Sequence, residues 1–378
     1  MAALTEEQTM IRDQAKSWVT EQAPVRKFRE LRDSGSQSGF SPDTWSAMVD
    51  MGWTGMIIPE QYGGSDLGYL TFGIVLEETG RQLTASPLFA SALVGASAIL
   101  AGGSEAQKQS VLPKIVDGSA IVTLAIDESP RHSPCNISLT AEKSGDGFKL
   151  SGTKCFVAEG GSATHFVVGA RTSGNPGDTA GISVFLVAAD AAGISRQPLK
   201  TADSRNYANL TFDGVEVDAE SLRGKQGDGW QMLESTLDRA RAGIAAEMLG
   251  TGSQAFDMTL EYFKTRVQFG QVIGSFQALG HRAAGLFSKM ELARSCVEAA
   301  LAGIDSESKD IPQLCSLAKC KAGEFLYNMS NELIQIHGGI GMTDEFDAGF
   351  YLKRARAVEA IYGNQAFHRD RYASLLNF

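Results

Sequence analysis

The amino-acid sequence predicts a mostly helical protein with a β-domain in the middle of the chain. Residues 1–118 and 223–378 contain long stretches in which apolar residues recur at helical spacing. Residues 119–222 instead break into short runs rich in Val, Ile, Phe and Thr, with turn residues between them. The pattern indicates three domains: an N-terminal helical domain over 1–118, a central β-domain over 119–222 in the form of a small barrel or sandwich, and a C-terminal antiparallel helical bundle over 223–378.

Local signals then define individual elements. Thr5 and Gln8 have the spacing of a capping box, which predicts a helix that begins after Thr5. The stretch 57–69, rich in Gly and containing Pro59, is predicted to be a loop. Further helices are expected over 41–51, 72–83, 91–103, 105–118, 229–256, 257–268, 276–305, 311–338 and 347–374, and strands over 121–128, 137–145, 148–159, 165–173, 182–189, 194–200 and 208–217.

The composition excludes several classes of protein. The chain has 378 residues, with 34 Lys and Arg against 44 Asp and Glu and a formal net charge of −10. This balance argues against nucleic acid and anionic membrane as partners. A hydrophobic fraction of 43% allows a large core and excludes disorder. No run of about 18 apolar residues predicts a membrane-spanning helix, and the acidic N-terminus is unlike a signal peptide.

The cysteines point to the redox environment. There are five of them, scattered along the chain, and no pair has CxxC spacing. This usage predicts reduced thiols in a cytoplasmic protein, with no disulfide framework. A structural zinc or other metal site is not expected.

Two segments of the C-terminal part carry residues suited to binding a nucleotide. In the first, 266–277, the chain offers a guanidinium, a planar amide and an aromatic face, which suit a diphosphate and an adenine ring. In the second, 335–343, a helix is expected to end at Gly338 and Gly339, where backbone N–H groups can approach an anion closely. Taken alone, the second segment is equally compatible with a simple helix stop of the Schellman type.

Together and in this order, these segments resemble the acyl-CoA dehydrogenase family. The resemblance covers nearly the whole chain and includes PEQYGG at 59–64, FDGVEVDAESL at 212–222, RVQFGQVIGSFQ at 266–277 and QIHGGIGMT at 335–343. It implies an N-terminal helical domain, a central β-barrel, a C-terminal four-helix bundle, a tetramer built from dimers, and FAD as cofactor. It also implies a reaction in which a glutamate removes an α-proton and flavin N5 takes a β-hydride, so that an acyl-CoA becomes a trans-enoyl-CoA.

The resemblance implies a flavin site that two subunits share. The β-domain of one subunit holds the isoalloxazine ring, on which Phe156 is expected to stack here, and the neighbouring subunit holds the ADP half. The residues of this chain implied for the ADP half are Arg266, Gln268, Phe269, Ile273, Phe276, Gln277, Gln335, Gly338 and Gly339.

Both positions at which the family carries its catalytic glutamate lack a carboxylate here. One position matches Gly363 and the other matches Ala240, so no catalytic residue is assigned. Glu247 shares a helix face with Ala240 but lies about 10 Å further along, too far for proton transfer. A structural role is expected for Glu247 and for Asp238. Glu359 would replace Gly363 only if the register shifted by one helical turn.

The segment expected to line the flavin ring departs from the family as well. A threonine that contacts the flavin pyrimidine edge is replaced by Ile126 or, with a shift of one residue, by Asp127, and a serine is replaced by His132. Phe156 keeps the stacking aromatic. Ala158 replaces a threonine whose hydroxyl hydrogen-bonds near flavin N5.

These departures favour one interpretation and leave two alternatives open. The residues expected to contact a subunit's own flavin ring and to serve as its base are replaced. The residues expected to bind the ADP half of the neighbour's FAD are retained. The chain is therefore interpreted as the subunit without the catalytic glutamate in an α2β2 acyl-CoA dehydrogenase; in the family, such heteromers act on bulky steroid side-chain CoA thioesters. The alternatives are a self-sufficient homotetrameric flavoenzyme with an atypical base or elimination chemistry, and a non-enzymatic acyl-CoA-binding scaffold.

Two histidine–arginine pairs are expected to lie at the surface without binding a ligand. His281 and Arg282 are expected on a solvated helix face. His368 and Arg369 are expected at the surface, paired with Asp370, in preference to a contact with CoA or a second chain.

Overall fold

Residues 4–378 are described by the computed structural model, and they form two units. The first unit contains the described part of residues 1–30, residues 69–84 and residues 241–378. The second contains residues 31–68 and 85–240. Each unit therefore combines stretches that are far apart in the sequence. The division into domains at 118/119 and 222/223 remains a proposal.

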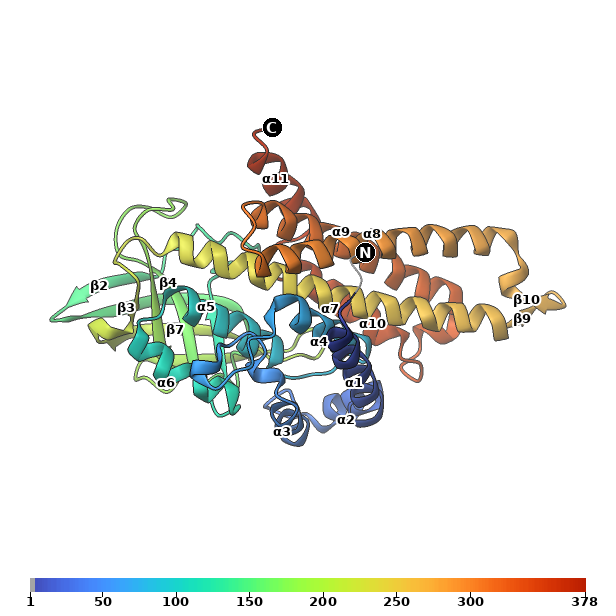
Figure 1. Ribbon diagram of the computed structural model, residues 1–378, viewed down its shortest axis with the longest axis horizontal. Helices are drawn as coiled ribbons and strands as arrows, with labels where there is room; N and C mark the ends of the chain where they lie inside the picture. The colour runs from blue at the N-terminus through green and yellow to red at the C-terminus, as the bar shows by residue number, and fades with distance from the viewer. Residues whose placement is uncertain (1–3) are drawn as a thin grey trace. The chain divides into compact units, whose positions relative to one another are not determined.

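Long helices make up most of the first unit. α7 (Trp230–Thr265) enters this unit at Arg241, and α8 (Gln277–Asp305) and α9 (Ile311–His337) follow it. Figure 1 shows α8 and α9 side by side, with a short hairpin where α7 leads into α8. The other elements are α1 (Glu6–Gln22), α2 (Val25–Ser34, divided between the units), α4 (Gly68–Arg81), β9 (Val267–Gln268), β10 (Gln271–Val272), η5 (Ile273–Ser275), η6 (Gly338–Met342), α10 (Ala348–Ala360) and α11 (Gln365–Leu375).

The capping box predicted at the start of α1 is confirmed. Thr5 Oγ1 accepts a hydrogen bond from Gln8 N at 3.1 Å, and Thr5 N donates to Gln8 Oε1 at 3.1 Å. Two of the N–H groups that a helix leaves without a partner at its start are thereby satisfied.

Two expected helix boundaries in the C-terminal part are wrong. The helices expected over 229–256 and 257–268 form the single helix α7, because no glycine or proline stands at 256–257 to interrupt it. The helix expected over 347–374 is divided into α10 and α11. α10 ends where Ile361 takes an extended conformation (φ −66°, ψ 126°), and Tyr362 (φ 54°) and Gly363 (φ 106°) then continue the turn with positive φ.

Glycines let α4 and α7 approach closely within the first unit. A Cβ atom at Gly250 would lie 1.8 Å from Glu77 O, and one at Gly80 would lie 2.3 Å from Glu247 O. Thr251 Oγ1 donates to Gly80 O at 3.1 Å across the same contact. The two backbones therefore touch where a larger residue has no room.

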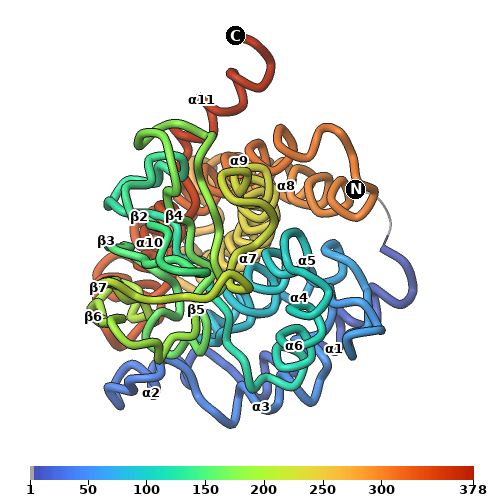
Figure 2. The backbone as a smooth tube through the Cα atoms, turned by 90° about the vertical axis from the view of Figure 1, so that its left-hand side faces the viewer, coloured from blue at the N-terminus to red at the C-terminus, as the bar shows by residue number. Residues whose placement is uncertain are grey.

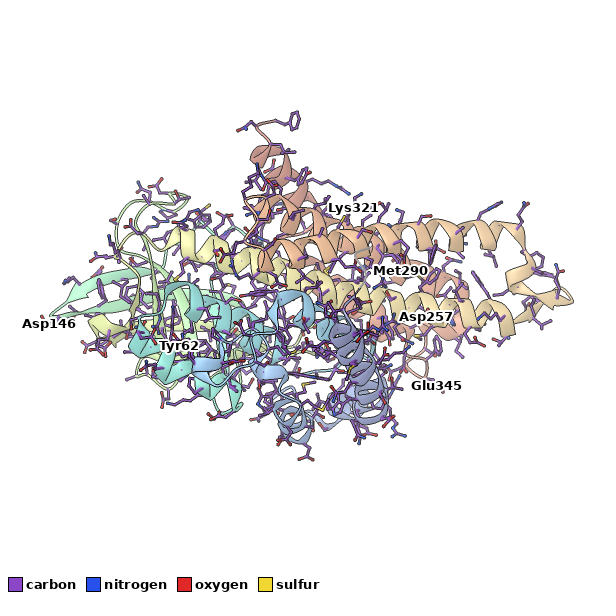
Figure 3. All side chains as sticks on the ribbon, in the orientation of Figure 1. Tyr62, Asp146, Asp257, Met290, Lys321 and Glu345 are labelled. Carbon is purple, nitrogen blue, oxygen red and sulfur yellow. The ribbon has the colours of Figure 1, made fainter. Side chains whose placement is uncertain are left out.

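The second unit contains the central sheet. Its strands run in the order β6-β7-β3-β2-β4-β5-β8, and β1 pairs in parallel with β4. Figure 2 shows β2, β3, β4 and β7 together, and Figure 3 marks Asp146 at the tip of the β2–β3 hairpin. The strands are β1 (Val122–Ala125), β2 (Thr140–Ser144), β3 (Gly147–Ala158), β4 (His165–Arg171), β5 (Ile182–Ala188), β6 (Ile194–Leu199), β7 (Tyr207–Val217) and β8 (Leu222–Arg223).

Short helices complete this unit. The expected strands over 121–217 correspond to β1–β7, whereas the two-residue strand β8 has no counterpart in the prediction. The loop predicted over 57–69 contains one 3-10 turn, η2 (Glu60–Tyr62), and runs into the start of α4. The remaining elements are α3 (Pro42–Asp50), η1 (Trp53–Gly55), η3 (Leu88–Gly95, wound as a π-helix), α5 (Ala96–Gly102), α6 (Glu105–Val116) and η4 (Ala219–Ser221).

No helix within residues 4–378 combines the length and the apolar character that crossing a membrane requires.

The glycine contact between α4 and α7 gives a stability prediction. Gly250→Ala should lower the free energy of unfolding by about 1–3 kcal/mol or more, because its Cβ has no room beside Glu77 O. Chemical denaturation measures the change. Gly349→Ala in α10 is the control, since a Cβ there meets no atom within 4 Å, and it should stay within about 1 kcal/mol of the parent chain. Equal behaviour of the two variants would contradict the close contact.

Candidate functional site

The hairpin between α7 and α8 presents an aromatic ring outside the bundle. β9 and β10 pair through Gln268 and Gln271, and the two turn residues Phe269 (φ 54°) and Gly270 (φ 78°) both have positive φ. This is the geometry of a type I′ turn, which follows the twist of the strands. Phe269 is 90% exposed, and its ring meets that of Phe276 edge to face at 6.1 Å. The hairpin therefore holds an open aromatic face in a fixed place.

A second loop at this end of the first unit has an accessible backbone. α9 ends at His337, and Gly338 follows with φ 62° and ψ −133°, a conformation almost restricted to glycine. A Cβ atom at Gly338 or Gly339 would meet nothing within 4 Å. The absence of side chains leaves this backbone open to a ligand.

The ring of His337 fixes this loop beside the end of α7. It is 4% exposed, stacks on Tyr262 at 4.2 Å between ring centroids, and lies tilted against Phe346 at 4.6 Å. Its Nδ1 donates to Leu333 O at 2.8 Å. Burial lowers the pKa of His337, so the ring is neutral at pH 7. Since Tyr262 precedes Arg266 by one helical turn, this stack brings the two motifs to the same end of the unit.

The polar side chains of the two motifs are free to bind a ligand. Arg266, Gln268 and Gln335 are exposed and make no side-chain hydrogen bond within residues 4–378. Phe269, Gln277, Gly338 and Gly339 are exposed as well, and Phe276 is half-buried. Ile273 differs, because it is only 8% exposed and packs at the base of the hairpin. A guanidinium, two amides, an aromatic face and open backbone N–H groups form a set that fits the ADP half of FAD.

The segment after β1, in the second unit, has its polar groups paired internally. Asp127 Oδ2 lies 2.8 Å from His132 Nδ1, and Asp127 Oδ1 accepts from Ser133 N at 3.2 Å. Glu128 accepts from Lys154 Nζ at 2.8 Å and also receives two backbone N–H groups. The carboxylates and the imidazole therefore hold the segment together, and no hydroxyl stands at 126 or 127.

Phe156 projects from an irregularity in β3. The pairing of β3 with β7 shifts between Lys154 and Val157, and Phe156 takes a left-handed φ of 51° there. The side chain of Asn209 supports this conformation by accepting from Phe156 N at 3.1 Å. The ring of Phe156 is 52% exposed, as a stacking surface requires. Residue 158 is an alanine, so its side chain has no hydroxyl that could donate a hydrogen bond to a flavin.

The turn at Gly363 leaves no room for a longer side chain. Its φ of 106° is strained for any residue but glycine. A Cβ would lie 2.4 Å from Phe367 Cδ1 and 2.9 Å from His368 Nε2. The space beyond Gly363, the position expected from the sequence to match the family glutamate, is therefore filled by Phe367 and His368.

A buried lysine holds this turn in place. Lys319 Nζ donates to the carbonyl oxygens of Val358 at 3.0 Å, Glu359 at 3.3 Å and Gly363 at 3.1 Å. Arg241 Nε donates to Tyr362 O at 3.4 Å. Burial lowers the pKa of Lys319 to about 8. Sequence reasoning missed Lys319, although a lysine between Ala318 and Cys320 in an apolar stretch was a signal.

The carboxylates nearest in sequence to Ala240 and Gly363 are paired with groups of the protein. Glu247 Oε1 accepts from Arg354 Nε at 2.8 Å and from Arg354 Nη2 at 2.5 Å, and both residues are buried. Glu359 Oε1 accepts from Gln365 N at 3.1 Å. Ala240 is fully buried. The structural role expected for Glu247 agrees with its ion pair.

The surface position expected for His368 is wrong. His368 is fully buried, because α11 packs this face toward the turn and α9. Its Nε2 lies 3.1 Å from Tyr362 O and its Nδ1 lies 3.4 Å from Ser316 Oγ. Arg369 and Asp370 are exposed. The solvated position expected for His281 and Arg282 agrees with the structure, since both are exposed and Arg282 pairs with Glu332.

The lowered pKa of Lys319 gives a pH-dependent prediction. The unfolded chain keeps the lysine proton up to its ordinary pKa of 10.5, whereas the folded chain releases it near pH 8. Folding stability contributed by Lys319 should therefore be constant below pH 8 and rise above it, by about 2 kcal/mol at pH 9.5. Denaturation of the parent chain and of Lys319→Met between pH 7 and 9.5 isolates this contribution. A constant difference between them would show that Lys319 titrates normally.

Comparisons with known proteins identify the family. Family models match residues 5–119 (acyl-CoA dehydrogenase, N-terminal domain), 130–215 (middle domain) and 227–376 (C-terminal domain). The chain is 31% identical over 372 residues to "Probable acyl-CoA dehydrogenase YngJ" of Bacillus subtilis (strain 168), covering 97% of both chains.

Solved structures agree with this assignment. The fold matches a variant of the Tcur3481–Tcur3483 steroid ACAD with a TM-score of 0.88 and 31% identity, covering 98% of both chains. It matches the ChsE4–ChsE5 complex from Mycobacterium tuberculosis with a TM-score of 0.90 and 27% identity, covering 99% of this chain and 98% of that one. The predicted fold class, helical with a central β-domain, is confirmed. The chain belongs to the acyl-CoA dehydrogenase family, whose members are FAD-dependent oxidoreductases.

Proposed function

We propose that this chain is the subunit without the catalytic glutamate in an α2β2 acyl-CoA dehydrogenase that introduces an α,β double bond into an acyl-CoA thioester. One contrast carries the proposal. The side chains of Arg266, Gln268 and Gln335 are exposed and unpaired, whereas the base position at Gly363 is filled by a closed turn. A partner subunit with a glutamate would supply the base.

The residues of this chain would serve the ADP half of the partner's cofactor. FAD, when bound, supplies the acceptor for the hydride that leaves the acyl chain. The guanidinium of Arg266 would neutralise the diphosphate, and the amides of Gln268 and Gln335 would donate to the nucleotide. Gly338 and Gly339 would let backbone N–H groups reach the same anion.

The second unit also supports a flavin ring held by the partner subunit and not by this chain. Where the family places a flavin-contacting hydroxyl, this chain has Ile126 and an Asp127–His132 pair. Ala158 removes a second hydroxyl. Phe156 alone keeps its place with an exposed ring, and it is the observation that favours the alternative, a self-sufficient homotetramer.

The solved relatives suggest partner and substrate. Two of the similar structures are named as pairs of different proteins, Tcur3481–Tcur3483 and ChsE4–ChsE5, and the first is a steroid ACAD. We therefore propose a second acyl-CoA dehydrogenase-like chain as partner. The CoA thioester of a steroid side chain is the first substrate to test, beside straight-chain acyl-CoA.

Flavin content tests the shared site. Purified alone, the chain should carry little or no FAD by visible absorbance, and co-expression with a Glu-bearing family member of the same organism should give one FAD per two chains. Acyl-CoA turnover should appear only in the complex. About one FAD per chain in a homotetramer with turnover would refute the proposal.

Two substitutions in this chain separate the alternatives within the complex. Arg266→Ala should weaken FAD binding by about tenfold or more, since it removes the cation that faces the diphosphate. Phe156→Ala should leave flavin content and absorbance unchanged, because the ring sits in the partner. A change in the flavin spectrum with Phe156→Ala would instead place a ring in this chain's β-domain.

A further inference from the structure

Four helices of the first unit surround a cavity of about 660 Å³. α1, α4, α7 and α8 all contribute residues to its wall (Figure 1), and every lining residue belongs to the first unit. Cavities of about 300–1,000 Å³ are the size that holds small organic molecules. On α7 the wall includes Leu249, which lies about 25 Å along the helix from Arg266. The cavity is therefore separate from the residues proposed to contact FAD.

Close contacts along α4 fix the position of this wall. A Cβ atom at Gly73 would lie 2.3 Å from Leu301 Cδ1, so α4 and α8 touch there. Further along, α4 touches α7 at Gly80. Between these two contacts, Arg294 Nη1 donates to Glu77 Oε1 at 2.8 Å and links α8 to α4. The cavity thus has a wall held by backbone packing and by an ion pair.

The inner part of the wall is apolar. Its α7 and α8 residues are buried, and its α4 residues are half-buried. A hydrocarbon chain placed against this surface would be removed from water, which favours binding. The apolar side chains that line the cavity are Leu70, Ile74, Ala246, Leu249, Val297 and Leu301.

Glu78 brings a carboxylate without a hydrogen bond to this cavity. The residue is 5% exposed, and neither of its carboxylate oxygens has a hydrogen-bond partner within residues 4–378. Oε2 is enclosed, 3.6 Å from Arg81 Nε, so Oε1 is the oxygen available to a ligand. Arg81 itself donates through Nη1 to Asp257 of α7 at 3.0 Å, at the position that Figure 3 marks. Burial raises the pKa of Glu78, because water solvates this carboxylate poorly.

Glu298 supplies a second carboxylate from α8, one turn after Arg294. It is half-buried, lines the same cavity, and makes no hydrogen bond or ion pair within the described part of the chain. Burial is the largest influence on this group and raises the pKa of Glu298. Two carboxylates with little access to water therefore line one cavity, each without a hydrogen-bond donor.

The cations in the cavity wall do not neutralise these two carboxylates. Arg81 and Arg294 donate to the partners given above. Arg12 pairs with Asp13 at 2.9 Å. Lys16 is exposed, and water and salt screen the charge of an exposed ammonium. The interior of the cavity consequently favours a positive charge.

We propose that this cavity binds a small organic cation, a primary amine on a hydrocarbon chain, with its ammonium group at Glu78 and Glu298. An ammonium group has three N–H donors and no acceptor, which suits two carboxylates that lack donors. The hydrocarbon chain would lie against Ile74, Val297 and Leu301. The site does not depend on the proposed shared flavin.

Calorimetric titration and thermal unfolding of the full chain at pH 7 test the site with n-hexylammonium chloride. One amine should bind per chain, and the Tm should exceed that in sodium chloride of equal ionic strength. 1-Hexanol should bind at least about tenfold more weakly, because it offers the carboxylates no positive charge. From propylamine to hexylamine, the affinity should rise by about fourfold for each methylene group that is removed from water.

Three substitutions locate the binding site. Glu78→Gln should weaken the binding of hexylammonium by about tenfold or more. In sodium chloride it should unfold at or above the Tm of the parent chain, because a buried charge without a hydrogen bond is gone. Glu298→Gln should weaken binding as well. Glu345→Gln is the matched control, since it removes the same charge from an exposed residue of the same unit (Figure 3), and it should keep the affinity of the parent chain.

The outcomes separate this site from general attraction of a cation to an acidic protein. The proposal is wrong if the parent chain does not bind hexylammonium, if it binds hexanol equally well, or if Glu78→Gln keeps full affinity. Should Glu78→Gln fail to fold, Glu298→Gln decides, and full affinity in that variant overturns the proposal. None of these measurements uses flavin, so a failure here leaves the proposed shared flavin site as it stands.

Discussion

The turn between α10 and α11 depends on a single buried ammonium. A helix end leaves carbonyl groups without partners, and in α10 the chain also turns sharply at Tyr362 and Gly363. Lys319 donates to three carbonyl oxygens gathered at that point. Its positive charge also lies favourably at the negative end of the α10 dipole. Together with Arg241 and His368, which contact Tyr362 O, Lys319 holds the turn in which Gly363 has a positive φ and no space for a side chain.

Charged groups in the first unit divide into two populations. Glu247 and Arg354 are buried and satisfy each other, and Lys319 is satisfied by backbone. Removing either member of such a set leaves an uncompensated group in the interior. Arg266 and the amides near it have the opposite character, since they are exposed and unpaired. The unit therefore keeps the groups that stabilise it apart from the groups that can bind a ligand.

Local sequence patterns predicted the helices and strands well, but they did not predict how these elements pack against one another. The capping box at Thr5 and the strand runs of 121–217 depend on neighbouring residues alone, and the structure agrees with them. The break at Gly363 was less visible, although Gly363–Asn364 is a turn signal. The two segments proposed to bind the nucleotide, 266–277 and 335–343, were recognisable as sequence motifs. Their placement at one end of the unit depends on the stack of Tyr262 and His337, which are 75 residues apart and share no sequence pattern. The burial of His368 likewise depends on packing against Ser316.

The packing at Gly363 makes it difficult for a single substitution to place a carboxylate at this position. A mutation to glutamate meets Phe367 and His368 at once and places an L-residue at a strained φ. The neighbours that fill the space are themselves tied to the turn, His368 through Tyr362 O and the backbone through Lys319. Placing a longer side chain at 363 would therefore need several coordinated changes, because substitutions in contact with one another are not independent. If the proposed assignment of Gly363 is right, a catalytic carboxylate could return here only together with changes in the residues packed around the turn.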